Sequence, residues 1–412
     1  MSSTVRTRAA SLLLLLALWT PTAAEEGPSF DVHYDVLLLP DDGLARVTIR
    51  IEGQGLPEAL RLRVDPLRHA EFTGSGEIDM EKGRLVWRLP KSGGRLRYDV
   101  KIDHDRNGPG KDAAITDRWA LFRGEDLVPS MAVNTADDVE SDATLTMHLP
   151  QGWSVVTPWK RREDDTFVIE QPHRFVDRPT GWVLAGRLGV TREKVAGVRL
   201  AIANPSGHGL HRMDILALLR WTLDDLVDVF PDDHPERFAI VGAADPMWRG
   251  GLSGPDSLYL HADRPLIQSD GTSPILHELV HSFMHAKAGE DGDWIVEGIA
   301  EYYSVALLRR SRTFSKRRYE RSLEKLREKG SGVENLLVPK ATADVAARGA
   351  IILAELDTRI REATGDEKSL DDVARILQRE RVPITTRRFR DIAEEVSGVN
   401  LTGFFDESVG AP

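Results

Sequence analysis

The sequence predicts an α+β protein, in which a β-sandwich-like domain precedes a mainly helical domain with a small sheet. Up to residue 197, short runs of alternating apolar residues are separated by turns rich in Gly, Pro and Asp, which is typical of an all-β sandwich. From residue 198 onward, apolar residues recur at helical spacing instead. The 412 residues suffice for two domains. We therefore expect a β-rich domain over residues 25–197 and a second domain over residues 198–412.

The first 24 residues have the features of a secretory signal peptide. Arg6 and Arg8 form a positive start, and the apolar run over residues 9–19 is too short to span a bilayer of about 30 Å. Small residues up to Ala24 form a cleavage site. We expect export to the periplasm or the medium after cleavage near Ala24. No other stretch predicts an integral membrane span.

Six runs carry the strand pattern of the first domain. Their apolar side chains alternate with polar ones, so that one face of each strand can pack on a core. These runs cover residues 33–40, 45–53, 59–66, 95–102, 143–150 and 181–190.

The second domain is predicted to begin with a helix over residues 213–230, where apolar residues have helical spacing. Residues 237–243 and 257–262 follow as predicted strands. Ser273 and Pro274 then form a helix start, with a hydroxyl cap and a proline at the first position, and Gly289 is a natural stop. A further helix is predicted to begin at Asp293.

The helix after Ser273 contains "HELVH", residues 277–281. His277 and His281 lie four residues apart, so both imidazoles project from one face and can reach one ion. Zinc prefers such nitrogen donors, and a catalytic site keeps one position open for water. Glu278 is placed to act as the general base for that water. The alternative is a buried helix whose histidines are hydrogen-bonded in the core.

A third ligand is expected from the next helix, in "DWIVEGIAEYY". Glu297 and Glu301 lie four residues apart and face the same way. We assign Glu297 to the metal and Glu301 to a position behind it, where it accepts a hydrogen bond from a metal-binding imidazole, with His277 as the expected partner. His285, one turn beyond His281, is expected beside the site or in the core, with a role as alternative ligand left open. One zinc ion is the predicted cofactor.

These motifs resemble the gluzincin metallopeptidases, whose ligands are the two histidines of H-E-x-x-H and a glutamate on the next helix. The resemblance is closest to the glycyl aminopeptidase-like branch, and looser to the aminopeptidase N and leukotriene hydrolase branch. It extends to "RGGLSGPDSLYLHADRP" upstream and "EEVSGVNLTGFFDESV" downstream, about residues 200 to 410 in all. It implies a thermolysin-like catalytic part to about residue 310, a helical tail to residue 412, and a peptide or protein substrate.

Two departures from the family pattern concern the substrate. Ala346 stands where the family has a tyrosine that hydrogen-bonds the tetrahedral oxyanion. Ser253 stands where the aminopeptidases have the glutamate that anchors a free amino terminus. Arg348, Tyr302, Tyr303 or His261 is a candidate replacement for the tyrosine. The substrate cleft is expected to include the following residues: Gly251, Tyr259, His261, Tyr303 and Arg348.

The leading interpretation is an exported zinc metallopeptidase that hydrolyses peptide bonds through a metal-activated water. Because Ala346 replaces the oxyanion tyrosine, one alternative is a zinc-binding pseudopeptidase that acts as a peptide- or protein-binding module. Another alternative is a binding or scaffolding protein without a metal.

The charge of the chain limits the classes of partner that we expect. The net charge of −11 argues against non-specific nucleic-acid binding, which depends on cationic contacts to phosphates. The chain has no cysteine and hence no disulfide. One basic run, residues 309–329, is predicted to be a solvated helix with internal ion pairs through Glu320 and Glu324. Its alternative is a docking patch for an anionic partner or a membrane surface.

Overall fold

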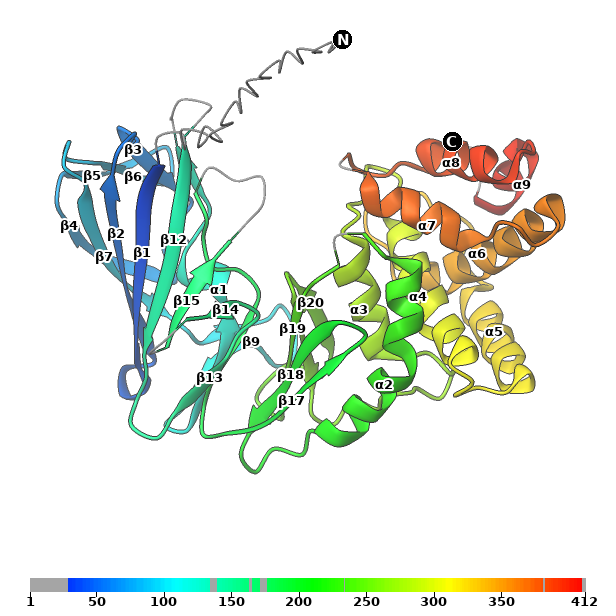
Figure 1. Ribbon diagram of the computed structural model, residues 1–412, viewed down its shortest axis with the longest axis horizontal. Coiled ribbons are helices and arrows are strands. Elements are labelled where there is room, and N and C mark those ends of the chain that lie inside the picture. Colours follow the sequence, from blue (N-terminus) through cyan, green and yellow to red (C-terminus); the bar gives the residue numbers. More distant parts are fainter. Residues whose placement is uncertain are drawn as a thin grey trace, which may run out of the picture.

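The computed structural model describes residues 29–133, 139–162, 165–170, 176–232, 234–380 and 382–409. The signal peptide predicted over residues 1–24 lies outside these residues. The described chain is α+β, as expected, with strands in its first half and mainly helices in its second (Figure 1). Among the described residues, no helix combines the length and apolar character needed to cross a bilayer.

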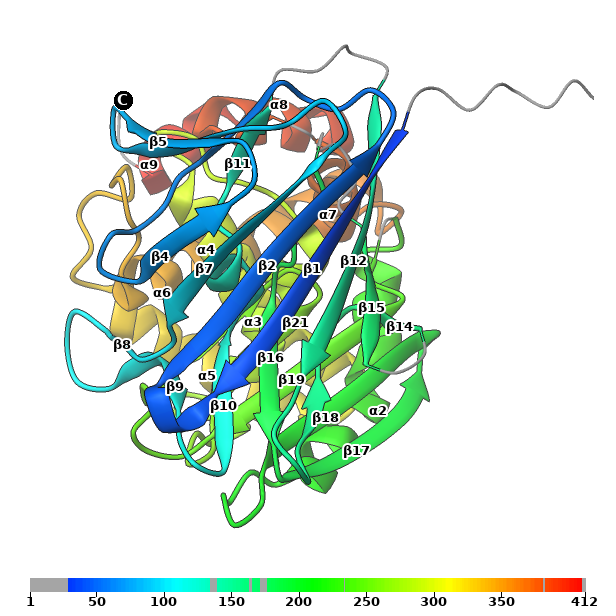
Figure 2. The same cartoon turned by 90° about the vertical axis from the view of Figure 1, so that its left-hand side faces the viewer.

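A seven-stranded sheet forms the outer side of the β-rich part (Figure 2). Its first strand shows why the sequence alternates: Val32, Tyr34 and Val36 are buried, whereas His33 between them points to the other face. The strands are, in spatial order, β14 (Lys160–Arg161), β15 (Thr166–Ile169), β12 (Glu140–His148), β1 (Ser29–Leu39), β2 (Leu44–Gly53), β7 (Gly94–Lys101) and β4 (His69–Gly74). β1 runs parallel to β12 and antiparallel to β2, to which the short 3-10 helix Pro40–Asp42 connects it.

Two further sheets share an apolar core with the first one. One has the order β13 (Ser154–Val156), β16 (Trp182–Gly186), β10 (Trp119–Arg123), β9 (Lys111–Ile115) and β8 (His104–Asp105). The other has the order β11 (Met131–Val133), β3 (Ala59–Leu62), β6 (Arg84–Arg88) and β5 (Glu77–Glu81). The short helix α1 (Gly124–Leu127) follows β10.

Along the chain, the fourth sheet follows the β-rich part and leads into the helical part. Its order is β17 (Leu188–Val195), β18 (Val198–Pro205), β19 (Arg237–Ala243), β21 (Ser257–His261) and β20 (Gly251–Gly254). β18, β19 and β21 are parallel, while the edge strand β20 is antiparallel to β21. The run 181–190, expected as one strand, divides between β16 and β17, which belong to different sheets.

An apolar cluster joins the fourth sheet to the β-rich part. Trp182 and Leu184 of β16 pack with Val241 of β19 and Tyr259 of β21, all of them buried. The indole N–H of Trp182 also donates a hydrogen bond of 2.9 Å to the Leu252 carbonyl in β20. These contacts fix the position of β20.

The helical part packs around one central helix, α4, which contacts α3 and α6 (Figure 1). The helices are α2 (Arg212–Val229), α3 (Pro274–Met284), α4 (Asp293–Arg310), α5 (Lys316–Gly330), α6 (Ala343–Thr364), α7 (Leu370–Arg379), α8 (Thr386–Ser397) and α9 (Thr402–Val409).

Helix α3 ends five residues before the predicted stop at Gly289. Its last residue is Met284, and His285 caps it in the left-handed conformation at φ 55°. The chain then pairs with Ile384: the Ile384 N–H donates to the Lys287 carbonyl, and the Gly289 N–H donates to the Ile384 carbonyl. This pairing takes the backbone groups that another helical turn would need.

Candidate metal centre

Helix α3 presents two imidazoles and a carboxylate from an otherwise buried surface. The Ser273 hydroxyl accepts a hydrogen bond from the backbone of the first turn, and Pro274 occupies the first position. Apart from His277, Glu278 and His281, all residues of the helix are buried. The apolar residues thus fix the helix, and its three partly exposed side chains all belong to the expected site.

Helix α4, which carries the second set of carboxylates, packs directly against α3 and also lies close to α6. A Cβ on Gly298 would lie 3.2 Å from the Gly349 Cα, and a Cβ on Gly349 would lie 2.9 Å from the Trp294 carbonyl oxygen. Two glycines therefore allow the helices to approach. Glu297 and Glu301 lie on either side of this crossing point.

The metal-ligand atoms of three residues converge. The Nε2 atoms of His277 and His281 lie 3.2 Å apart. Glu297 places Oε2 3.3 Å from Nε2 of His277 and Oε1 3.6 Å from Nε2 of His281. Within the part of the chain that the structure describes, this is the one group of three potential ligands whose atoms all lie within 4.8 Å of one another. The structure thus brings together the three residues expected to bind the ion.

These separations fit a tetrahedral zinc ion. With zinc–nitrogen bonds of about 2.0–2.1 Å, two donors on a tetrahedron lie about 3.3 Å apart. The observed 3.2, 3.3 and 3.6 Å are close to that value. Two imidazoles and a carboxylate are also a ligand set that zinc uses at catalytic sites, where water takes the fourth position.

The electrostatics of the group favours a cation. Burial acts to lower the pKa of His277, but the carboxylates of Glu297 and Glu301 outweigh it and raise this pKa to about 10. Burial acts to raise the pKa of Glu297, but His277 and His281 hold it well below its usual range. A positive charge is therefore stabilised between these side chains, and a metal ion that binds there takes the place of a proton.

Glu301 supports His277 from behind. Its Oε2 lies 3.1 Å from Nδ1 of His277, the ring nitrogen on the side away from Glu297. Nδ1–H donates to this carboxylate, which fixes the tautomer and turns Nε2 toward the ligand group. The other oxygen, Oε1, lies 3.7 Å from Nζ of Lys329.

Glu278 is held by the edge of the fourth sheet. Its Oε2 accepts a hydrogen bond of 2.7 Å from the backbone N–H of Ser253 in β20. Gly251, in the same strand, lies so close that a Cβ there would be 3.5 Å from the Glu278 Cγ. The sheet edge thus contacts the expected general base directly.

A cavity of about 330 Å³ opens over these residues. The candidate ligands His277 and Glu297 line it, together with Glu278 and the buried Glu301. Its further lining residues are Trp248, Gly251, Arg264, Gln268, Thr272, Pro274, Lys329, Ala341, Thr342, Ala343 and Ala346. The sequence motifs did not predict that Arg264, Gln268 and Lys329 would line the cavity. Lys329 ends the basic run of residues 309–329, and this was the one sequence signal that could have indicated it.

Of the five expected cleft residues, only Gly251 lines this cavity. Tyr259 is buried and its hydroxyl donates to the Trp248 carbonyl over 2.6 Å. His261, also buried, faces Asp245, whose Oδ1 lies 3.5 Å from its Nε2. Tyr259 lies in the middle of β21 and packs against Trp182 of the β-rich part, while His261 ends the same strand. Neither residue lines the cavity.

Tyr303 and Arg348 also lie away from the cavity. The Tyr303 hydroxyl donates to Oδ1 of Asp371 over 2.8 Å, on a different face of α4 from Glu297. Arg348 packs against Gly330 at the end of α5. His285, expected beside the histidine pair, is exposed at the end of α3, because the helix stops before it could form another turn.

Ala346 does line the cavity, from the first turns of α6. The position aligned with the oxyanion tyrosine is thus beside the candidate metal centre. Tyr302, the remaining candidate for replacing that tyrosine, faces Asp357, with 3.4 Å between its hydroxyl and Oδ2. None of the four candidate replacements lines the cavity.

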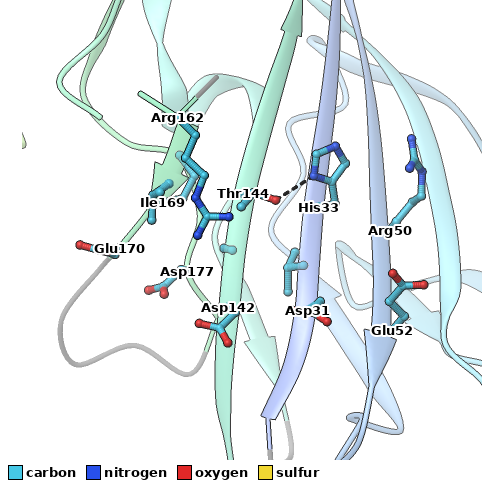
Figure 3. A pocket seen from close by; sticks show the side chains of 13 residues that line it. Asp31, His33, Arg50, Glu52, Asp142, Thr144, Arg162, Ile169, Glu170 and Asp177 are labelled. Carbon is cyan, nitrogen blue, oxygen red and sulfur yellow. Dashed lines mark hydrogen bonds between the residues drawn. The ribbon is translucent and has the colours of Figure 1, made fainter. Parts of the chain in front are cut away.

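A larger cavity, of about 590 Å³, lies on the polar face of the seven-stranded sheet (Figure 3). Asp31, Glu52 and Asp142 point into it from neighbouring strands, together with His33 and Arg50. Among the described residues these carboxylates form no ligand group of the kind seen at His277. The candidate chemistry therefore lies in the smaller cavity.

Comparison with known proteins shows that this chain is similar to solved structures in its three-dimensional fold. No family model matches the sequence, and no curated protein matches it. The chain is similar to an aminopeptidase N family protein from Idiomarina loihiensis, with a TM-score of 0.72 and 16% identity over 92% of this chain and 76% of that one.

It is also similar to an M1 zinc metallopeptidase from Deinococcus radiodurans, with a TM-score of 0.61 and 16% identity over 94% of this chain and 93% of that one. A mutant of an M1 zinc metallopeptidase from the same organism, bound to a Tyr-Ser-Ala substrate, gives a TM-score of 0.60 and 15% identity over 95% and 96% of the two chains. The chain thus has the fold of M1 zinc metallopeptidases.

Proposed function

We propose that this protein is a zinc-dependent metallopeptidase that hydrolyses peptide bonds. The observation that carries the proposal is the convergence of His277, His281 and Glu297 at tetrahedral separations, with Glu278 beside them on the same cavity. The fold shared with M1 zinc metallopeptidases supports it.

The residues divide the work as follows. Nε2 of His277, Nε2 of His281 and the carboxylate of Glu297 would hold one zinc ion. When bound, zinc lowers the pKa of a water toward about 7 and polarises the carbonyl of the substrate. Glu278 accepts the proton of the attacking water and then passes it to the leaving amine. The Ser253 N–H holds one oxygen of Glu278, which fixes the orientation of the base.

The test compares wild type with Glu278→Gln. A glutamine keeps the shape and can still accept the Ser253 hydrogen bond, but it cannot take up a proton. We expect one zinc per chain in both proteins, and cleavage of a peptide library by wild type alone, with a loss of at least about 10³-fold in kcat/KM in the variant. Glu362→Gln, an exposed position on α6, is the matched control. Activity retained in Glu278→Gln would contradict the role of Glu278.

A second candidate function is a pseudopeptidase that binds zinc and peptides without efficient turnover. Ala346 favours it, since losing one oxyanion donor typically costs about 10²–10³ in rate. The same experiment separates the two functions. Peptide binding with one zinc and no cleavage by wild type would establish the pseudopeptidase.

The domain layout that we propose differs in one boundary from the layout expected from the sequence. β17 and β18 pair along their whole length, so a boundary at residue 197 would fall inside a hairpin. We place the division near residue 187 instead, with a β-sandwich-like accessory domain before it and a thermolysin-like catalytic part and helical tail after it. Membership of the glycyl aminopeptidase-like branch stays a prediction from the sequence.

We also propose that the protein is exported. Cleavage near Ala24 would release a mature chain to the periplasm or the medium. Mass spectrometry of the amino terminus, after expression with the native leader, tests this directly. A protein that keeps Met1 and stays in the cytoplasm would contradict export.

A further inference from the structure

Helix α5 carries a stripe of cations on one face. Arg317, Arg321, Lys325 and Lys329 follow one another at intervals of four residues, so that their side chains project from the same side. These four residues are called the α5 stripe. At 1.5 Å per residue it is about 18 Å long. Like charges four residues apart destabilise a helix slightly, so helix stability does not account for the pattern.

The stripe is not neutralised by its own helix. Lys316 pairs with Glu320, and Arg327 pairs with Glu355 of α6, but both cations lie off the stripe. Among the described residues, Arg317 and Arg321 take part in no ion pair, and both are exposed. The sequence predicted one solvated helix over residues 309–329 with internal ion pairs through Glu320 and Glu324. The basic run is instead divided between the end of α4 and α5, and of these two glutamates, in the part of the chain that the structure describes, only Glu320 forms an ion pair within α5.

The α5 stripe extends from a neighbouring hollow to the cavity of the candidate metal centre. Arg317, Arg321 and Lys325 line a hollow of about 320 Å³ beside α5. Lys329, at the other end of the stripe, lines the cavity over the metal ligands. Gln268 lines both, so the two hollows adjoin.

The segment 268–272 forms the wall opposite the stripe and is fixed to α5. Gly271 has φ +95° and lies so close to the helix that a Cβ would overlap the Ser322 hydroxyl. Lys325 Nζ donates a hydrogen bond to the Ser269 carbonyl. Asp270 is the one carboxylate among the residues that line this hollow. Its Oδ2 lies 3.8 Å from Nζ of Lys329, so Asp270 and Glu301 neutralise the end of the stripe nearest the metal centre, whereas Arg317 and Arg321 stay unpaired among the described residues. The hollow beside Arg317, Arg321 and Lys325 therefore keeps an excess of cations on a chain whose net charge is −11.

We propose that the substrate is an acidic peptide, which lies along the α5 stripe with its scissile bond at the metal centre. This proposal rests on the proposed peptidase function. An extended peptide advances about 3.3 Å per residue, so the 18 Å stripe matches about five residues. The preferred acidic residues therefore lie about two to six positions from the scissile bond, on one side of it. Ser253, in place of the aminopeptidase anchor glutamate, offers no carboxylate to a free amino terminus.

The test uses two peptides that the wild type cleaves at the same bond, with three Glu or three Gln residues in that flank. We expect the Glu peptide to have a kcat/KM about tenfold higher at low salt, falling toward equality at high salt. The double variant R317Q/R321Q should lose most of this preference and keep the rate on the Gln peptide. The double variant K316Q/R327Q removes the same charge from other faces of α5 and should behave as wild type.

Binding separates this proposal from peptide hydrolysis itself. Fluorescence anisotropy of both labelled peptides is measured on zinc-loaded E278Q with and without the R317Q/R321Q changes. Selective binding of the Glu peptide without cleavage by wild type would refute hydrolysis but sustain the acidic-peptide groove. Equal binding of both peptides, or an R317Q/R321Q protein that matches its control, would overturn the groove. So would binding to phosphatidylglycerol vesicles that displaces the Glu peptide, since the stripe would then be a membrane-docking surface.

Discussion

The backbone N–H of Ser253 lies 2.7 Å from Oε2 of Glu278 and donates a hydrogen bond to it. The donor is on the edge strand β20, and the acceptor is on α3, so the contact joins the sheet to the helix that carries the histidine pair. One oxygen of the carboxylate is thereby fixed by a group that cannot rotate away. The other oxygen can then accept a proton from a defined direction.

Replacing Ser253 by proline tests this contact. Proline has no N–H, and an outward-facing position on an edge strand tolerates it. We expect kcat/KM to fall by about tenfold while bound zinc stays at one per chain, because only the base loses its support. Ser253→Ala keeps the N–H and should keep the activity. Equal activity of the two variants would mean that the hydrogen bond does not position Glu278.

The two glutamates of α4 should differ in their effect on the metal. Glu297→Ala removes a ligand and should prevent stoichiometric zinc binding. Glu301→Ala removes only the partner of Nδ1 of His277 and should weaken zinc binding by about 10–100-fold. Competition with a chelator of known affinity measures both. Equal weakening would show that the two carboxylates share the ligand role.

Zinc affinity should rise with pH over an unusually wide range. The pKa of His277 is raised to about 10, so below that pH the ion must displace a proton. We expect the association constant to increase by about tenfold per pH unit from pH 6 to 9, after correction for metal hydrolysis. Calorimetry in buffers of different ionisation enthalpy counts the released proton.

Glu301→Gln is the informative variant for this pH dependence. It removes one of the carboxylates that raise the pKa of His277, so the affinity should level off at a lower pH than in wild type. A flat profile in the wild type would contradict a protonated His277.

Ala346→Tyr should raise turnover. The side chain at this position lines the cavity, and the residues considered as replacement donors do not. A phenol that reaches the oxyanion would recover part of about 3 kcal/mol of transition-state stabilisation, which we expect to appear as at least a tenfold gain in kcat/KM. Ala346→Phe fills the same space without a hydroxyl and should give no gain. If the tyrosine and phenylalanine variants behave alike, a donor such as Lys329 or Arg264 already serves the oxyanion.

The pairs within each helix could be predicted because short-range geometry determines them, whereas the meeting of Glu297 with the two histidines depends on the packing of α4 against α3 and was inferred from the ligand set that zinc requires. Four-residue spacing on one helix is enough to place His277 beside His281, and Glu297 beside Glu301. The cap at Ser273 also marks the start of α3 correctly. Such features depend on neighbouring residues in the chain, which the sequence shows directly.

The cleft could not be predicted in the same way, because distant segments build it. Tyr259 and His261 were expected there, but their strand packs against β16 of the β-rich part. His285 was expected near the ion, but pairing of the following residues with Ile384, about a hundred positions away, ends the helix first. Arg264 and Lys329 reach the cavity from loops and helix ends that only the tertiary structure brings together.

The contact between Gly298 and Gly349 has an evolutionary consequence. It sets the spacing of α4 and α6, and Ala346 lies one turn before Gly349 on α6. The backbone at position 346 is therefore held beside the ligand-bearing helix whatever side chain it carries. A lineage with this fold can lose or regain a reactive group there by a single substitution, without rebuilding the scaffold. Catalytic strength in such proteins can drift while the architecture and the ion site stay unchanged.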